Sequence, residues 1–232
     1  MPALKRFQHG YGVRRWHGKL WQRMIAIVLL IWPASTLWAE PMRVVALGDS
    51  LVHGYGLEPE QGFVAQMQAW LDRQGLDVEL VNAGLSGDTT SGGLARLDWA
   101  LGDDADALIV SLGGNDILRA MPPALARSNI REILARATAR DLPVMLVGIV
   151  VPPNYGATYQ SEFDAIYPEL ADEFDTLYYA DFLGVFTQSG DRAATYQRWF
   201  QPDGLHPNAE GVARIVEDMG PVVKALTDRA AR

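Results

Sequence analysis

The fold is decided by residues 43–51, RVVALGDSL, in which a run of apolar side chains ends abruptly at Gly48, Asp49 and Ser50. A short apolar run without polar alternation is typical of a strand that is buried on both faces, as in a parallel sheet. The glycine, the acid and the serine that follow are typical of a turn and of a helix start. This stretch therefore predicts a buried strand that leads Ser50 into the first turn of a helix.

The same pattern recurs along the chain. Four more apolar runs predict strands over residues 78–81, 107–112, 144–150 and 177–180. Stretches with helical spacing predict helices over residues 63–74, 94–101, 125–139, 162–174 and 207–230. Alternation of strand and helix implies a doubly wound α/β domain of three layers, with a central parallel sheet of about five strands. In such a domain, the ligand site lies beyond the carboxyl ends of the strands.

Chemically capable residues gather at these strand ends. The first strand is followed by residues 48–50 (GDS), the second by 82–88 (NAGLSGD), the third by 113–116 (GGND), and the fifth, after an insert, by 203–206 (DGLH). Because the carboxyl ends of parallel strands meet at one edge of a sheet, we expect these segments to share one site.

Ser50 and two residues far along the chain predict acyl transfer by a serine nucleophile. A serine hydroxyl needs a base within hydrogen-bond reach, and the base needs a partner that fixes its tautomer. Asp203 and His206 can supply both functions from one tight segment. Taken singly, Ser50 is more typical of a helix N-cap, and Asp203 with His206 could be an ordinary polar helix start.

Acyl transfer also requires donors for the developing oxyanion. Gly87 offers an unobstructed backbone N–H and Asn115 offers a side-chain amide, while the N-terminus of a helix at Ser50 would stabilise negative charge. The structural alternatives are a turn glycine at position 87 and a loop asparagine at position 115. His53 follows Ser50 on the same turn and is poorly placed to reach its hydroxyl, so we interpret it as a pocket-wall or surface residue.

Residues 1–39 differ from the rest of the chain. They hold basic residues up to Arg23 and no acid, and an uncharged, mostly apolar run extends from Met24 to Ala39. The run is shorter than the ~20 residues that a membrane-spanning helix needs, and Ala39 offers a small-residue cleavage site. We interpret residues 1–39 as a signal peptide and residues 40–232 as a periplasmic or secreted domain. An uncleaved membrane anchor is the alternative.

Composition narrows the chemistry further. Six of the 20 basic residues and none of the 28 acidic residues lie in residues 1–39, so residues 40–232 carry 14 basic against 28 acidic residues, a net charge of −14. Such a surface repels nucleic acid and anionic lipid. The chain contains no cysteine, which excludes disulfides, thiolate metal sites and a cysteine nucleophile.

Four segments together resemble the motifs of the SGNH (GDSL) hydrolase family. They are Gly48-Asp49-Ser50-Leu51, the Ser-Gly-Asp-Thr that contains Gly87, Gly114-Asn115-Asp116, and Asp203-Gly204-Leu205-His206-Pro207. The likeness covers nearly all of residues 43–225. In order and spacing it is most similar to the bacterial periplasmic branch of thioesterases, lysophospholipases and arylesterases.

The resemblance implies a role for each site residue. Ser50 is the implied nucleophile, His206 its base and Asp203 the residue that orients the base. The backbone N–H groups of Ser50 and Gly87 and the amide of Asn115 are the implied oxyanion donors. The family also implies a flavodoxin-like α/β/α sandwich, no metal and no cofactor. The implied activity is hydrolysis of acyl or aryl esters, acyl thioesters or lysophospholipids through an acyl-enzyme on Ser50.

The loops around the motifs favour a hydrophobic substrate. We expect a site lined by apolar or aromatic side chains, at Leu118, Met121, Pro122, Pro152, Tyr155 and Tyr159. The expected partner is therefore a small acyl ester or thioester, with no nucleic acid, no metal and no stable membrane insertion after processing. The same residues could instead only pack the loops down.

Two other functions stay open on the sequence. A carbohydrate or peptidoglycan O-acetyl esterase would use the same catalytic residues, and a non-catalytic exported domain would keep the four segments only as loops. Two more are disfavoured. Val52 stands where the nucleophile elbow of the α/β-hydrolases requires glycine, and Asp49 places a negative charge where a flavin phosphate would sit.

Overall fold

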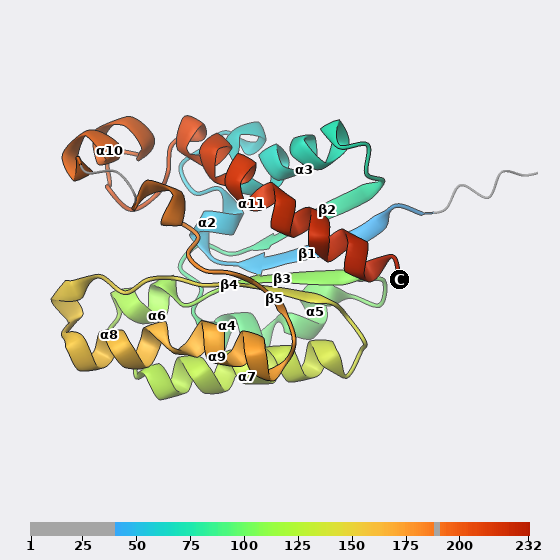
Figure 1. Cartoon of the computed structure of the whole chain (residues 1–232), viewed down its shortest axis with the longest axis horizontal. Coiled ribbons are helices and arrows are strands. Elements are labelled where there is room, and N and C mark those ends of the chain that lie inside the picture. The colour runs from blue at the N-terminus through green and yellow to red at the C-terminus, as the bar shows by residue number, and fades with distance from the viewer. Residues whose placement is uncertain (1–39, 188–190) are drawn as a thin grey trace, which may run out of the picture. The chain divides into compact units, whose positions relative to one another are not determined.

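Five parallel strands form the centre of the part of the chain that the structure describes, residues 40–187 and 191–232 of a computed structural model (Figure 1). The strands are β1 (Met42–Gly48), β2 (Val78–Gly84), β3 (Ala107–Ser111), β4 (Val144–Val147) and β5 (Leu177–Tyr179), in the spatial order β2-β1-β3-β4-β5. The predicted α/β fold with a five-stranded parallel sheet is confirmed. The predicted signal peptide, residues 1–39, lies outside the described residues.

The side chains of β1 explain why residues 44–47 are all apolar. Val44 and Ala46 belong to one hydrophobic core, Val45 and Leu47 to another, and all four are fully buried. Successive side chains of a strand point to opposite faces, so a sheet covered on both faces requires apolar residues at every position. The sheet is therefore the middle layer of three.

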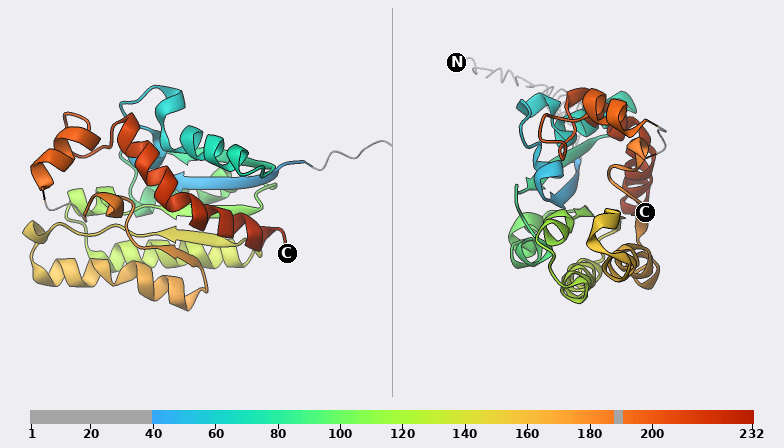
Figure 2. Two further views of the ribbon diagram at one scale, coloured as in Figure 1. Left: turned by 45° about the horizontal axis from the view of Figure 1, so that its top comes forward. Right: turned by 90° about the vertical axis from the view of Figure 1, so that its left-hand side faces the viewer.

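Helices cover both faces of this sheet. On the Val44 side lie α2 (Ser50–His53), α3 (Phe63–Arg73) and α11 (Ala209–Ala230). On the Val45 side lie α4 (Thr90–Ala95), α5 (Leu97–Leu101), α7 (Pro123–Thr138), α8 (Ala157–Asp164) and α9 (Ile166–Glu173). The end-on view of Figure 2 shows the teal and red helices on one side of the strands and the green and golden helices on the other.

Two predicted helices are each divided in two, so the prediction of continuous helices was wrong there. Residues 162–174 fall across the end of α8 and the whole of α9, with Ala165 between them. Pro168 has no N–H to donate to the carbonyl of Asp164, and its ring would crowd that carbonyl, so a continuous helix is disfavoured. Residues 94–101 fall across α4 and α5, which meet at Arg96.

Several short elements were not predicted. They are α6 (Gly114–Leu118), α10 (Arg192–Trp199), and the 3₁₀ turns η2 (Pro59–Gln61), η3 (Pro153–Tyr155) and η4 (Gly184–Phe186). Helices this short carry little periodic signal. Among the described residues, no helix is both long and apolar enough to cross a membrane.

The strand register aligns the three loops that matter. Gly48, the last residue of β1, lies opposite Gly84 of β2 and Ser111 of β3. The chain therefore leaves three neighbouring strands at the same level, and the segments that begin at Asp49, Leu85 and Leu112 lie side by side.

Candidate active site

Ser50 is the first residue of α2, directly after β1. The carboxylate of Asp49 caps this short helix by accepting a hydrogen bond from the Leu51 N–H, with an Oδ1–N distance of 3.1 Å. The backbone turns so tightly from β1 into α2 that a Cβ at Gly48 would lie 2.3 Å from Cγ2 of Val52. Only glycine at position 48 lets the strand pass into the helix here.

The imidazole of His206 joins Ser50 to Asp203. Nε2 of His206 lies 2.8 Å from Oγ of Ser50, and Nδ1 lies 2.7 Å from Oδ2 of Asp203. The other oxygen of Asp203 accepts the backbone N–H groups of Leu205 at 2.9 Å and of His206 at 3.0 Å. The aspartate thus holds both the ring and the backbone of the histidine.

The charge of Asp203 sets the direction of these hydrogen bonds. Burial acts to raise the pKa of this carboxyl, but the hydrogen bonds from the His206 ring and from two backbone N–H groups hold it at about 2. Asp203 is therefore ionised at neutral pH and accepts from Nδ1–H. Nε2 is then free to accept from the Ser50 hydroxyl. A neutral imidazole in this tautomer is the form that can take a proton from a serine.

Gly87 lies in a turn beside this pair. The Asp88 N–H donates to the Leu85 carbonyl at 3.0 Å, and Gly87 has φ of 82°. A positive φ at the third position is the signature of a type II turn, which favours glycine there. The exposed Gly87 N–H donates to no other described residue. It is therefore available to an incoming oxygen.

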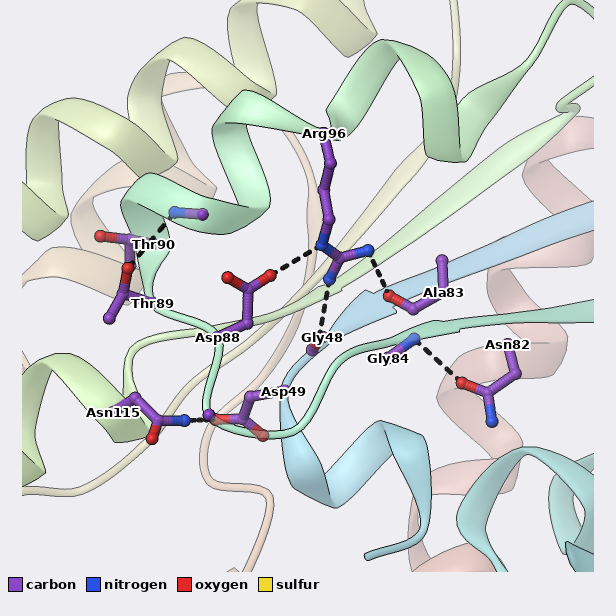
Figure 3. Close-up of polar contacts among 12 residues, drawn as sticks. Gly48, Asp49, Asn82, Ala83, Gly84, Asp88, Thr89, Thr90, Arg96 and Asn115 are labelled. Atoms are coloured by element: carbon purple, nitrogen blue, oxygen red, sulfur yellow. Dashed lines mark hydrogen bonds and ion pairs between the residues drawn. The ribbon is translucent and has the colours of Figure 1, made fainter.

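Asn115 approaches the same place from α6. Its side-chain amide donates to Oδ2 of Asp49 across 3.4 Å, as Figure 3 shows. Asp49 is 2% exposed. Burial raises its pKa to about 6, against the hydrogen bonds from the Leu51 N–H and Asn115 and the field of His206. Asp49 therefore both caps the helix of Ser50 and orients the amide of Asn115.

A hydroxyl within hydrogen-bond distance of an imidazole, with a free N–H and an amide nearby, is the arrangement that acyl transfer requires. The sequence pattern of the GDSL-like lipase/acylhydrolase family matches residues 46–214, well over half of the chain. The chain belongs to this family. It is a serine hydrolase that acts on ester bonds.

Individual relatives of this lipase/acylhydrolase agree with the assignment. The esterase TesA of Pseudomonas aeruginosa is 37% identical over 203 residues, which cover 87% of this chain and 95% of that protein. The thioesterase 1/protease 1/lysophospholipase L1 of Escherichia coli is 33% identical over 217 residues, 93% of this chain and 96% of that protein. The crystal structure of AlinE4, an SGNH-hydrolase family esterase, shares 40% identity and covers 80% of this chain and 96% of that chain, with a TM-score of 0.65.

Two residues that the sequence did not indicate join the histidine loop, residues 200–208, to the segment of α2, the helix that begins with Ser50. The side-chain amide of Gln201 donates to the carbonyls of Tyr55 at 2.8 Å and Pro207 at 3.0 Å, while its backbone N–H donates to the His206 carbonyl at 2.8 Å. The ring of Tyr55 lies 4.7 Å from the His206 ring, centroid to centroid. Nothing in the sequence pattern marks Gln201, because Tyr55, the partner that ties it to α2, lies 146 residues away in the chain.

A buried polar network links the loops of Gly87 and Asn115. Asp116 is fully buried and accepts the Thr90 hydroxyl at 2.6 Å and the Thr90 N–H at 2.8 Å. The amide of Asn129, on α7, donates to the same hydroxyl at 2.9 Å. The acid beside Asn115 therefore anchors α6 to the start of α4, just after Gly87.

His53 lies outside the Ser50–His206–Asp203 set. Its Nδ1 is 2.8 Å from Oγ of Ser86, and its side chain is exposed. It therefore braces the Gly87 turn from α2. Within the described residues, no group of three or more histidine, cysteine, aspartate or glutamate side chains is arranged to hold a metal ion.

The residues expected to line the substrate site have mixed positions. Leu118 is 55% exposed at the end of α6, Pro152 is exposed, and Met121 and Tyr155 are half-buried. Tyr159 was expected in a loop, but it lies in α8, where its ring stacks on Tyr155 and its hydroxyl donates to the Met121 carbonyl at 3.0 Å. Tyr155 and Tyr159 are partly buried and pack against the hydrophobic core on the Val45 side of the sheet.

Proposed function

We propose that this enzyme hydrolyses hydrophobic acyl or aryl esters, acyl thioesters or lysophospholipids through an acyl-enzyme on Ser50. The observation that carries the proposal is the pair of short contacts at His206, 2.8 Å to the Ser50 hydroxyl and 2.7 Å to the Asp203 carboxylate. Their geometry is that of a nucleophile, its base and the residue that orients the base.

The proposed reaction has two halves. The Ser50 oxygen attacks the acyl carbon as its proton passes to Nε2 of His206, and Asp203 stabilises the imidazolium. The N–H groups of Ser50 and Gly87 and the amide of Asn115 stabilise the oxyanion. His206 gives the proton to the departing alkoxide or thiolate. Water then attacks the acyl-enzyme and gives a proton to His206, which passes it to the Ser50 oxygen as the bond between Ser50 and the acyl carbon breaks and the carboxylic acid leaves.

Exposed apolar side chains support a hydrophobic substrate. Four large ones lie in the segments that carry the proposed site residues, and each is at least half exposed: Tyr55, Leu85, Leu118 and Leu205. Leu205 stands between Asp203 and His206, and Leu85 opens the Gly87 turn. Exposed apolar side chains on the segments that carry a site offer a binding surface for apolar groups. Leu118, Met121, Pro152 and Tyr155 extend the proposed surface.

The names of the relatives support the same bond types. One is called an esterase and another a thioesterase and lysophospholipase. We further propose that residues 1–39 are an export signal and that the mature enzyme works in the periplasm or outside the cell. The basic, then uncharged, character of residues 1–39 carries this part of the proposal.

A rate panel tests the proposal. We would measure kcat/KM for p-nitrophenyl esters of increasing acyl length, acyl-CoA thioesters, a lysophospholipid and an acetylated sugar. Each buried CH₂ contributes up to ~0.8 kcal/mol, or roughly fourfold in kcat/KM, until the binding surface is full. The Ser50→Ala variant, with native circular dichroism, is the control and should lose several orders of magnitude in rate.

Two results would contradict the proposal. If folded Ser50→Ala keeps full activity, Ser50 is not the nucleophile. If kcat/KM is highest for the acetylated sugar and falls with acyl length, the protein is a carbohydrate O-acetyl esterase with the same catalytic residues.

A further inference from the structure

The turn that contains Gly87 must be held in a fixed position relative to Ser50 if its N–H is to stabilise an oxyanion. It is an exposed loop, yet its N–H must lie within hydrogen-bond distance of an oxyanion formed on Ser50. Within the loop, the Leu85 N–H donates to the Gly48 carbonyl at 3.0 Å, and the Asp88 N–H donates to the Leu85 carbonyl at 3.0 Å. These two backbone bonds leave the Asp88 side of the turn without a connection to β1.

Arg96 makes that connection from the junction of α4 and α5. Its guanidinium donates to three acceptors: Oδ2 of Asp88 at 2.7 Å, the Ala83 carbonyl at 2.8 Å and the Gly48 carbonyl at 2.9 Å. Figure 3 shows the side chain reaching back over the ends of β1 and β2. One residue thus joins the end of the strand that leads to Ser50, the end of β2 and the residue after Gly87.

The ion pair between Arg96 and Asp88 is largely shielded from water. The side chain of Arg96 is 17% exposed and that of Asp88 is 7% exposed. A buried ion pair is costly to break, because removal of one partner leaves the other charge unpaired in a poorly solvated place. Lysine could keep the charge, but its compact ammonium cannot span three acceptors as the planar guanidinium does.

The position of Asp88 is restricted from the other side as well. A Cβ at Gly92 would lie 1.8 Å from Oδ1 of Asp88. The backbone of α4 therefore packs directly against the carboxylate, and any side chain at position 92 would push it. Arg96 and Gly92 therefore contact the two oxygens of Asp88 from different sides.

We propose that Arg96 is a positioning residue for the hydrolysis, which sets the Gly87 N–H relative to Ser50 by clamping Asp88 to the ends of β1 and β2. The inference rests on the proposed function, since it takes Gly87 as an oxyanion donor. Arg96 touches no reacting atom. Its effect is on the geometry of the transition state, so it should act on kcat rather than on substrate binding.

Three arginine variants and one glycine variant test this inference. Arg96→Ala removes the clamp, Arg96→Lys keeps its charge, and Gly92→Ala displaces Asp88 without touching Arg96. Arg43→Ala is the matched control, because Arg43 is also partly buried, pairs with Asp104 at 2.7 Å and donates to the Leu101 carbonyl at 3.3 Å. Arg43 lies near the amino end of β1, away from Ser50.

The measurements are kcat, KM and melting temperature on one p-nitrophenyl ester, with and without millimolar methylguanidinium. A misplacement of about 1 Å can cost on the order of 10²-fold, so we expect that loss in kcat for Arg96→Ala with KM nearly unchanged. Arg96→Lys and Gly92→Ala should lose less. Methylguanidinium should restore part of the rate of Arg96→Ala, while Arg43→Ala should lose stability but keep its kcat.

The inference is overturned if Arg96→Ala keeps its kcat, or if it and Arg43→Ala lose equal activity for an equal drop in melting temperature. If Arg96→Ala does not fold, Arg96→Lys and Gly92→Ala decide in the same way, since unchanged kcat in both contradicts the clamp. Failure of the proposed function is distinct. It would appear as a wild-type enzyme that hydrolyses none of the esters, or as an active Ser50→Ala variant.

Discussion

At the scale of single residues, the proposed site depends on side chains with two tasks. Asp203 accepts from the His206 ring with one oxygen and from the backbone of its loop with the other. Asp49 caps α2 with one oxygen and accepts from Asn115 with the other. A carboxylate can serve two partners in this way because each oxygen carries two lone pairs. Each aspartate therefore couples a local turn to a proposed catalytic group.

Asn115→Ala should lower kcat far more than it changes KM. An oxyanion donor acts mainly in the transition state, and loss of one costs roughly 10² to 10³ in kcat. Steady-state kinetics on an aryl ester, together with the melting temperature, would measure the effect. An unchanged kcat with a lowered melting temperature would show that Asn115 serves only the loop.

Asp49 should make stability depend on pH. Its pKa is raised from 3.8 to about 6 by burial, so the folded state favours the protonated form. The contribution of this group to stability is complete below the ordinary pKa and is lost as pH rises through about 6. The free energy of unfolding of Asp49→Asn, taken relative to that of the wild type, should therefore rise by on the order of 3 kcal/mol when the pH is raised from about 4 to about 8.

Urea denaturation of both proteins at the two pH values would measure this gain. The comparison between the proteins cancels the titration of the other groups. A stability difference that stays constant with pH would show that Asp49 is ionised as readily in the folded chain as in the unfolded one.

At the scale of elements, the histidine loop is the least regular part of the site. It joins α10 to α11, and α11 begins only after Asn208, which caps it by accepting the Gly211 N–H at 2.9 Å. The loop is held to the opposite segment by Gln201, whose amide reaches the carbonyl of Tyr55 in the turn after α2. A side chain of the loop therefore ties the segment of the base to the segment of the nucleophile.

Gln201→Ala should lower kcat by about tenfold or more, because even a small displacement of the base is costly. Gln68→Ala is a matched control: Gln68 ties α3 to β2, donating to the Val78 carbonyl and accepting the Leu80 N–H, both at 2.8 Å. Each variant should lose stability by about 1–3 kcal/mol for the unsatisfied backbone groups. Equal kcat values in the two variants would show that Gln201 has only a structural role.

At the scale of the whole molecule, the parallel sheet creates the site. Every strand of such a sheet ends at the same edge, and the connecting helices carry the chain back along its faces. The match of Gly48 with Gly84 and Ser111 places three loops together at that edge. Residues 40–232 also carry a net charge of −14, so we expect apolar contact and hydrogen bonds, rather than attraction to an anionic surface, to hold the substrate.

Processing should begin the mature protein at or near Glu40. Ala39 ends the uncharged run, and β1 starts at Met42, so a cut there would leave the first strand intact. N-terminal sequencing and the intact mass of the exported protein would locate the cut. Recovery of the exported protein with residues 1–39 still attached would favour the membrane anchor.

The sequence by itself determined the layers of the fold and the family. Continuous apolar runs such as residues 44–47 predict strands buried on both faces, because any polar residue there would lose its water. Turn residues next to those runs marked the edge where Ser50, Gly87 and Asn115 lie. Pro168 could also have shown the break between α8 and α9, since its missing N–H is a property of the residue alone.

Only the tertiary structure decided the contacts between distant segments. Ser50 and His206 are 156 residues apart in the chain, and their 2.8 Å contact depends on every element between them. Two of the three hydrogen bonds of Arg96, and the bond from Gln201 to Tyr55, run from side chains to backbone carbonyls, which belong to every residue and leave no mark in a sequence pattern. Local periodicity reports which face of an element is buried, but the partner of a hydrogen-bonding side chain is set by register and packing, which exist only in the folded chain.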